Sequence, residues 1–331
     1  MNEIPAMPAG GVTADSILPF EVEALDVRGR TVHLGPALDR ILSRHDYPEP
    51  VARLVGEAAA LTVLLGSALK FDGRFIMQTQ SDGPVRMLVV DFDTPDGLRA
   101  CARFDAEEVA TAIAEGRTSP AELLGHGHLA MTVDQGPAMS RYQGVVPLDG
   151  SSLEAAAHQY FMQSEQIPTL VRLAVAEVLS REAGAPARHA WRAGGMLVQF
   201  LPENADRVVV RDLDPGDAPD DADFDPADDD DAWTEASSLV ATVEDHELTD
   251  PEVSAETLLY RLFHERGVRV FDAAPVVERC RCSREKVTDM LKSFTVDDRR
   301  DMVKDGRIEV VCEFCSTAYD FDPLALEETE G

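Results

Sequence analysis

The chain has 331 residues, 44% of them hydrophobic, and a formal net charge of -31 from 61 acidic and 30 basic residues. This length allows one large domain with a sizeable apolar core and a smaller one beside it. A charge this negative repels nucleic acid phosphates and anionic membranes, so we expect neither nucleic acid nor membrane as a partner.

The sequence at residues 1–16, MNEIPAMPAGGVTADS, has neither a basic start nor an apolar run. We therefore expect no secretory signal and a cytoplasmic location. The most apolar stretch, residues 58–69, is bounded by Glu57 and Lys70 and is too short to cross a bilayer, which favours a buried helix. In a reducing compartment, clustered cysteines indicate metal binding or redox sensing rather than permanent disulfides.

Residues 1–205 mix strand and helix patterns and predict an α+β core domain with a mostly antiparallel sheet and packed helices. RFIMQTQSDGPVRMLVVDF indicates a hairpin around the turn at residues 81–84, and residues 48–71 carry an apolar pattern too long for a strand, which predicts a helix. Further strands are predicted in FEVEALDV, LRACARF, HLAMTVDQ, RYQGVVPL and GGMLVQFL, and further helices near residues 106–115 and 152–162.

The composition changes after the core domain. Residues 206–232 form an acidic segment dominated, over 212–231, by aspartate with proline and glycine. Such a segment cannot bury enough apolar surface to fold alone, so we predict a flexible, solvated spacer.

Residues 233–275 predict a helical linker, with helices near 234–243 and 251–265. For the second helix we expect Asp250 as N-cap, Pro251 at the first helical position and Gly267 as the stop. Its apolar stripe needs a partner surface, and periodicity leaves open whether the helix is docked permanently or conditionally; the stripe comprises Leu258, Leu259, Leu262 and Phe263.

Residues 276–331 form a predicted C-terminal module that holds four of the five cysteines. Cys280 and Cys282 lie two apart, so in extended backbone both sulfurs point to one face. Cys312 and Cys315 have the spacing of a zinc knuckle. A helix, a second helix capped by Thr295 and a strand between the pairs can bring them together, and four thiolates favour one tetrahedral Zn²⁺ per chain.

Two other interpretations of these cysteines differ in what they require of the sequence. A catalytic dithiol needs its reactive cysteine at a helix N-terminus, whereas Cys315 is followed by STAYDFDP, which indicates strand and turn. A constitutive zinc-ribbon binding module, directed at protein or nucleic acid, stays open because the segment carries local basic residues, namely Arg281, Arg284, Lys286, Lys292, Arg299 and Arg300.

The small size of the module also favours a redox switch over a permanent structural zinc site. A module of this size has a small core, so much of its folding free energy must come from the metal, on the order of 10 kcal/mol. Oxidation most easily forms the local disulfides Cys280–Cys282 and Cys312–Cys315, which close almost no loop. Losing the cross-link between the two pairs forfeits about 3.5 kcal/mol in the chain-entropy estimate, so the module is expected to unfold when oxidised.

CRCS followed by CEFC resembles the zinc signature of the redox-regulated holdase chaperones, the 33-kDa heat-shock protein family of bacteria. LFHERGVRVFD is similar to the linker of that family. In the large domain, four blocks resemble the family's blocks in order: SDGPVRMLVVDF, RYQGVVPLDG, YFMQSEQIPT and AGGMLVQFLPE. The aspartate-rich run departs from the pattern.

The resemblance implies a chaperone that is inactive while Cys280, Cys282, Cys312 and Cys315 hold zinc. It implies that oxidation pairs Cys312 with Cys315 first and Cys280 with Cys282 next, releases zinc and unfolds the module and the linker. The active form, a homodimer, would then hold unfolding clients without ATP and pass them to ATP-dependent refolding chaperones.

The remaining candidates indicate structure rather than chemistry. Cys101 lies in a strand pattern and is expected to be a buried small hydrophobe. His126 and His128 lack a third metal ligand and are expected at the surface. The segment Tyr160–Met162 is expected in the core. We find no phosphate-binding glycine loop, nucleophile elbow or catalytic triad, so we predict that the protein is not an enzyme.

Overall fold

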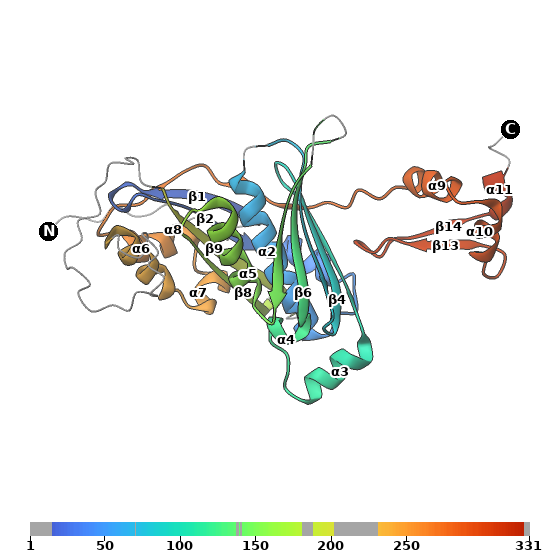
Figure 1. Cartoon of the computed structure of the whole chain (residues 1–331), viewed down its shortest axis with the longest axis horizontal. Coiled ribbons are helices and arrows are strands. Elements are labelled where there is room, and N and C mark those ends of the chain that lie inside the picture. The colour runs from blue at the N-terminus through green and yellow to red at the C-terminus, as the bar shows by residue number, and fades with distance from the viewer. Residues whose placement is uncertain are drawn as a thin grey trace, which may run out of the picture.

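The computed structural model describes residues 15–69, 71–136, 139, 141–180, 188–201 and 231–327. Two six-stranded sheets, A and B, pack around one long helix, and a small module lies at the end of the molecule opposite helix α6 (Asp231–Ala241; Figure 1). The predicted α+β class with mostly antiparallel pairing is confirmed, although the strands divide into two sheets. The acidic segment predicted at 206–232 lies almost wholly outside the described residues.

Sheet A joins strands that lie far apart in the chain. Its order is β10 (Arg269–Val270), β1 (Ser16–Val22), β2 (Val27–Leu34), β9 (Arg188–Phe200) and β8 (Thr169–Ser180), with β11 (Ala274–Pro275) also paired to β1. The prediction of one strand over FEVEALDV is wrong, because β1 ends at Val22 and a 3₁₀ turn, Glu23–Leu25, follows. Asp26 then adopts φ 48°, a left-handed conformation that aspartate tolerates, and the chain reverses into β2.

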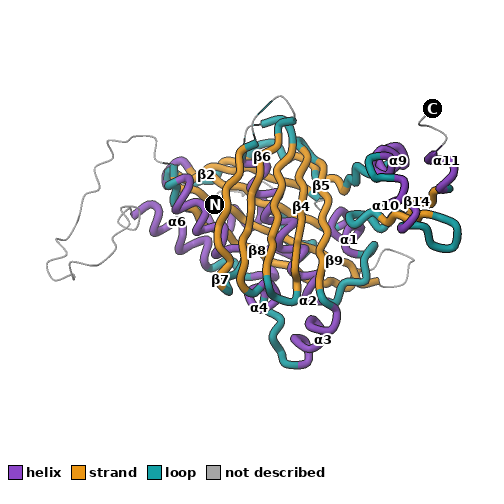
Figure 2. Tube along the Cα trace, turned by 45° about the vertical axis from the view of Figure 1, so that its right-hand side comes forward, coloured by secondary structure: helices purple, strands orange, loops and turns teal. Residues whose placement is uncertain are grey.

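Sheet B is antiparallel except at one edge. Its order is β12 (Val277–Glu278), β5 (Gly97–Phe104), β4 (Val85–Asp93), β3 (Arg74–Ser81), β6 (His126–Asp134) and β7 (Tyr142–Asp149), with β12 parallel to β5. On β4 the side chains of Leu88, Val90 and Phe92 enter the core, so Asp91 and Asp93 lie on the outer face, as strand alternation requires. Figure 2 shows this sheet face-on.

Helix α2 (Glu49–Ala68) packs between the two sheets. It lies within the predicted range 48–71 and extends beyond the most apolar stretch, 58–69, at its N-terminal end. By length and composition it can span a bilayer, but 78% of its apolar window is buried inside the protein. The expectation of a buried helix is therefore confirmed. The other core helices are α1 (Pro36–Leu42), α3 (Ala106–Ala114), α4 (Pro120–Leu124) and α5 (Leu153–Tyr160), which continues into a π-helical turn, Phe161–Glu165.

Three linker helices cover the face of sheet A that points away from α2. They are α6 (Asp231–Ala241), α7 (Asp245–Thr249) and α8 (Ala255–Phe263). The predicted N-cap of α8 is wrong, because Asp250 ends α7 and Ser254 accepts the hydrogen bond from Thr257 N that caps α8. The helix then ends at Phe263, before Gly267, and α7 was missed.

The chain between the linker helices and the cysteines pairs with both sheets. Strands β10 and β11 pair with β1 of sheet A, and β12 pairs with β5 of sheet B. We call residues 269–278 the strap, since they join one edge of each sheet.

The C-terminal module contains α9 (Arg284–Lys292), α10 (Val296–Asp301), the hairpin β13 (Ile308–Val311) and β14 (Ala318–Phe321), and α11 (Pro323–Glu327). Thr295 caps α10 through a capping box, as predicted. Among the side chains that the structure describes, its buried apolar cluster has four members, with partly buried side chains packed around them: Leu291, Ile308, Phe321 and Leu326. The four domain boundaries, 1–205, 206–232, 233–275 and 276–331, remain predictions.

Candidate metal centre

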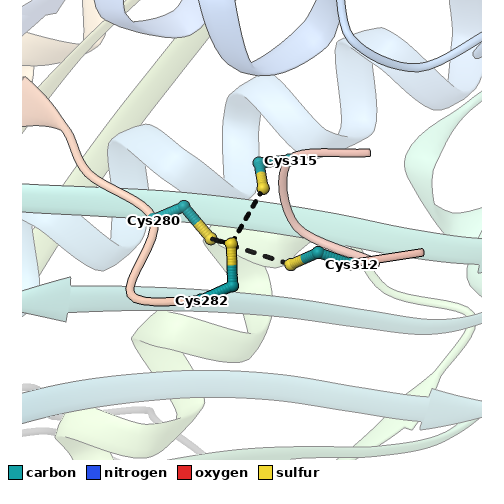
Figure 3. Close-up of side chains that lie close together, drawn as sticks. All are labelled: Cys280, Cys282, Cys312 and Cys315. Atoms are coloured by element: carbon teal, nitrogen blue, oxygen red, sulfur yellow. Dashed lines mark hydrogen bonds between the residues drawn. The ribbon is translucent and has the colours of Figure 1, made fainter. Parts of the chain in front are cut away.

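The four cysteines of the module come together from two loops (Figure 3). Cys280 and Cys282 lie in the loop between β12 and α9, which we call the first knuckle, and Cys312 and Cys315 lie in the turn between β13 and β14, the second knuckle. All four sulfurs are within 4.8 Å of one another. All four cysteines are free thiols, and Cys315 is the most buried, at 8% exposure.

The spacing of the sulfurs suits a tetrahedral ion. The Sγ–Sγ distances are 3.5 Å for Cys280–Cys282, 3.7 Å for Cys280–Cys312 and 3.3 Å for Cys282–Cys315. A Zn²⁺ with Zn–S bonds of about 2.3 Å requires sulfurs about 3.8 Å apart, so small movements would complete the geometry. A set of four soft sulfur donors favours zinc over magnesium or calcium.

The second knuckle is shaped by its backbone. Ser316 N donates to Cys312 O at 2.8 Å, and Cys312 N donates to Thr317 O at 3.0 Å, so the turn closes on itself. Ser316 has φ 54°. Tyr319 of β14 donates from its hydroxyl to Cys282 Sγ at 3.1 Å, which ties the hairpin to the first knuckle.

The thiols differ in acidity. Burial raises the pKa of Cys282 to about 12, and burial also raises the pKa of Cys312. For Cys315 burial acts in the same direction, but hydrogen bonding with Thr317 and the neighbouring thiols outweighs it and lowers the pKa to about 7. Because metal ligands must be thiolates, loading the centre with zinc would release protons.

The basic residues of the module are largely engaged inside the protein. Arg281 forms ion pairs with Asp91 and Asp93 of sheet B, Arg284 donates to Asp320 O, and Arg300 pairs with Asp297. Lys286 Nζ donates to Arg281 O at 2.8 Å. This arrangement weakens the nucleic-acid version of the zinc-ribbon alternative, which needs these cations free for phosphates.

The other sequence candidates are placed as follows. Cys101 is 3% exposed, as expected, and His126 and His128 are exposed on β6, also as expected. Tyr160 and Phe161 are in the core, but the expectation for Met162 is wrong, since the π-helical turn leaves this side chain 63% exposed.

Sequence reasoning missed the core-domain residues at the metal centre. Asp91, Asp93 and Arg99 of sheet B lie against the knuckles, far from the cysteines in the chain. Alternation in β4 and β5 places them on the outer face, but no sequence signal says what covers that face.

Comparison with known proteins gives the family. The family model described as Hsp33 protein matches residues 15–322. This chain belongs to the Hsp33 family. The 33 kDa chaperonin of Caulobacter vibrioides is 49% identical over 319 residues, which cover 96% of this chain and 97% of that protein. The 33 kDa chaperonin of Shewanella sediminis is 35% identical over 318 residues, 96% of each.

A solved structure of the Hsp33 family agrees in fold. The crystal structure of the 33 kDa chaperonin from Thermotoga maritima has a TM-score of 0.71 to this chain at 21% identity and covers 96% of this chain and 97% of that one. The Hsp33 family is a chaperone family and not an enzyme family, and a chaperone is expected to bind unfolded clients. The recognised resemblance and the fold class are thereby confirmed.

Proposed function

We propose that this Hsp33-family protein is a redox-regulated, ATP-independent holdase. Reduced, it holds one Zn²⁺ through Cys280, Cys282, Cys312 and Cys315 and is inactive. Oxidised, it loses the metal, unfolds its C-terminal module and linker, and binds unfolding proteins so that they do not aggregate.

One observation carries the proposal: an apolar face of the core domain is covered by the segment that leads directly into the four cysteines. On sheet A the covered side chains include Phe20, Val198 and Phe200. From the linker, Phe263 lies 6.0 Å from Phe20 and Trp233 lies 6.1 Å from Phe200, measured between ring centroids. If the linker leaves, a contiguous apolar surface of the kind that binds other proteins is exposed.

Zinc, when bound, cross-links the two knuckles and so supplies folding free energy to the module. With hydrogen peroxide as oxidant, one thiolate of a pair attacks the O–O bond, which breaks to give a sulfenic acid and hydroxide. The second thiolate attacks the sulfenic sulfur, forms the S–S bond and expels a second hydroxide. Two peroxides thus oxidise four thiolates to Cys280–Cys282 and Cys312–Cys315, with Cys312–Cys315 proposed first.

The consequence for the module follows from its size. Its buried apolar cluster has four members, which is too few to keep it folded after the cross-link between the knuckles is lost. Each new disulfide joins neighbours within one knuckle and leaves residues 283–311 unconstrained.

The remaining parts of the proposal concern location and partners. We propose that the protein acts in the cytoplasm, forms a homodimer on oxidation, and passes its clients to ATP-dependent refolding chaperones. The strong negative charge supports the absence of nucleic acid and membrane partners.

The test measures zinc content and suppression of client aggregation on one sample, before and after peroxide treatment at elevated temperature. We expect one zinc per chain to leave as activity and binding of a hydrophobic dye increase. The matched control is a Cys101→Ser variant, which should behave like the natural protein. Zinc that stays bound during activation, or that leaves without any gain of activity, would contradict the proposal and favour a constitutive zinc-ribbon module.

A further inference from the structure

The knuckles lie against the core domain as well as against each other. The residues between the two ligands of each knuckle make the contacts: Arg281 in the first, and Glu313 and Phe314 in the second. The charged and cation–π contacts of these three residues reach the outer face of sheet B, on β4 and β5.

The first knuckle is held by two carboxylates. Arg281 Nη2 donates to Asp91 Oδ2 at 2.8 Å, and its Nη1 donates to Asp93 Oδ1 at 3.2 Å. Asp91 is 3% exposed, so this ion pair is shielded from water. On the flank of the knuckle, Arg279 pairs with Asp96 at 3.0 Å.

The second knuckle is held by two arginines of β5. The guanidinium of Arg99 lies over the ring of Phe314, 3.8 Å from its centroid, and Arg103 forms an ion pair with Glu313. From the loop after α1, His45 Nε2 is 3.3 Å from Phe314 O and its Nδ1 is 3.3 Å from Ser316 Oγ.

Asp91 connects the two sets of contacts. Its Oδ2 accepts from Arg281 and also from Arg99 Nε at 2.9 Å. One buried carboxylate therefore orients both the cation inside the first knuckle and the cation stacked on the second. Burial lowers the pKa of the Arg99 guanidinium, but Asp91 and, after it, the Cys280 sulfur outweigh burial and raise it.

The charges explain why cations gather here. Four thiolates with one Zn²⁺ form a doubly negative centre in an already acidic protein. Arg99 and Arg281 lie beside it, and the field of Arg44 also reaches Cys280 and Cys315. Groups that orient metal ligands from outside the ligand set commonly alter metal affinity by about 10- to 100-fold.

We propose that the outer face of sheet B is a docking surface for both knuckles, and that Asp91, Asp93 and Arg99 are positioning residues that determine how firmly the centre retains its metal. The inference rests on the proposed zinc site and extends it into the core domain. Oxidation to two neutral disulfides removes the negative charge of the thiolates, while Asp91 and Asp93 keep theirs. Arg99 and Arg281 then lose their attraction to the centre, so the docking weakens when the metal leaves.

The test uses the reduced, zinc-loaded full-length protein without oxidant or client. Zinc transfer to a chromogenic chelator is timed for the natural protein, the double variant Asp91→Asn/Asp93→Asn and the control Asp134→Asn. Asp134 serves as the control because it lies on the same outer face, is 4% exposed and pairs with Arg74 at 2.7 Å and with Arg141 at 3.4 Å, not with a residue of the module. Its link to the docking surface is indirect, through Arg74, which lies 4.0 Å from Asp93. We expect zinc release at least about tenfold faster in the double variant and within about twofold in the control.

A second variant set separates docking from a general loss of sheet stability. Arg103→Glu alone should speed zinc release by about two- to fivefold, since the Arg103–Glu313 pair is exposed. Arg103→Glu/Glu313→Arg restores opposite charges and should return the rate toward that of the natural protein. The charge swap can restore the zinc-release rate only if residue 103 of the core domain contacts residue 313 of the second knuckle.

Cys101 gives an independent readout of undocking. It lies on β5 between Arg99 and Arg103 and is 3% exposed. Burial raises the pKa of its thiol, and the Glu313 carboxylate of the second knuckle is the next largest cause, which shows that the knuckle lies close to this thiol. Alkylation of Cys101 in the double variant should be faster than in Asp134→Asn.

Three outcomes would each overturn the inference: equal zinc-release rates in the double variant and the natural protein, equal acceleration of zinc release in Asp134→Asn, or no restoration of the rate in the charge swap. A natural protein that binds no zinc would instead overturn the proposed function.

Discussion

Gly194 of β9 lies directly beneath the backbone carbonyl of Leu248 at α7, so that a Cβ at Gly194 would come within 2.0 Å of that oxygen. The linker backbone thus touches sheet A where the sheet has no side chain. Nearby, Arg192 Nε donates to Thr249 O at 3.0 Å and holds the end of the same helix. The position of α7 depends on this close approach.

We expect Gly194→Ala to push α7 away from sheet A, because neither backbone can yield without breaking strand or helix hydrogen bonds. The linker should be destabilised by about 1–3 kcal/mol. Reduced, zinc-loaded Gly194→Ala should therefore bind a hydrophobic dye and suppress client aggregation without oxidation. Gly116→Ala is the control. With φ +71° an alanine there strains the backbone, but nothing lies within 4 Å of the added Cβ, so the variant pushes no other element away. Equal behaviour of the two variants would contradict the masking role of the linker.

Phe263 of α8 is 0% exposed and packs on Phe20. Phe263→Ala should cost about 3–5 kcal/mol of linker docking, through lost burial and the cavity left behind. Tyr260→Ala, on the same helix but 54% exposed, should cost little. Hydrogen exchange over residues 231–263 should accelerate in the first variant alone while its zinc content stays unchanged. Loss of zinc in Phe263→Ala would show that the linker and the module unfold as one unit.

Cys312→Ser removes one ligand of the proposed zinc site. We expect weaker zinc retention and unfolding of the module, whose apolar cluster is small, while the core domain keeps its structure. Calorimetry should show an early transition for the module and an unchanged later one, and Cys101→Ser should leave both in place. A single cooperative loss of all structure in Cys312→Ser would show that the boundary near residue 276 is misplaced.

Glu57 of α2 is largely buried, and burial, followed by the nearby Glu154 and Asp245, raises its pKa from 4.5 to about 7. The folded protein therefore binds this proton more tightly than the unfolded chain, so stability falls as pH rises from 4.5 to about 7. The thermal midpoint should be higher at about pH 6.5 than at about pH 8, and Glu57→Gln should flatten this difference. Below pH 6.5, buried His33, with its pKa lowered to about 4, acts in the opposite direction. An unchanged pH dependence in Glu57→Gln would rule out the assignment to this carboxyl.

Local patterns predicted much of the core domain. The hairpin β3–β4 and helix α2 follow from turn residues and apolar spacing, and so do β5, β6 and β7. Strand β8 was missed, although its partner β9 was predicted. At α8 the Asp250-Pro251 pair resembled a helix start, but Ser254 offered a cap nearer the apolar stripe, and the chain used it.

The four ligands of the metal centre could be predicted from the sequence, because the spacing of two close pairs of cysteines is itself a signal. The core-domain residues around the centre could not be predicted. The pairing of Asp91 with Arg281 depends on which sheet face the module covers, and tertiary packing alone determines that. The same holds for Gly194, which the sequence shows only as one glycine of a pair.

The strap contributes backbone hydrogen bonds to an edge of each sheet, through β10 and β11 at β1 and through β12 at β5. In the activation proposed above, the strap would depart with the linker and the module, and amide and carbonyl groups along β1 and β5 would lose these partners. Exposed strand edges recruit extended polypeptide irrespective of its side chains. An activated molecule would consequently offer unfolding chains two templates for strand addition beside its apolar face, and recognition through backbone groups suits a protein that must accept many unrelated sequences.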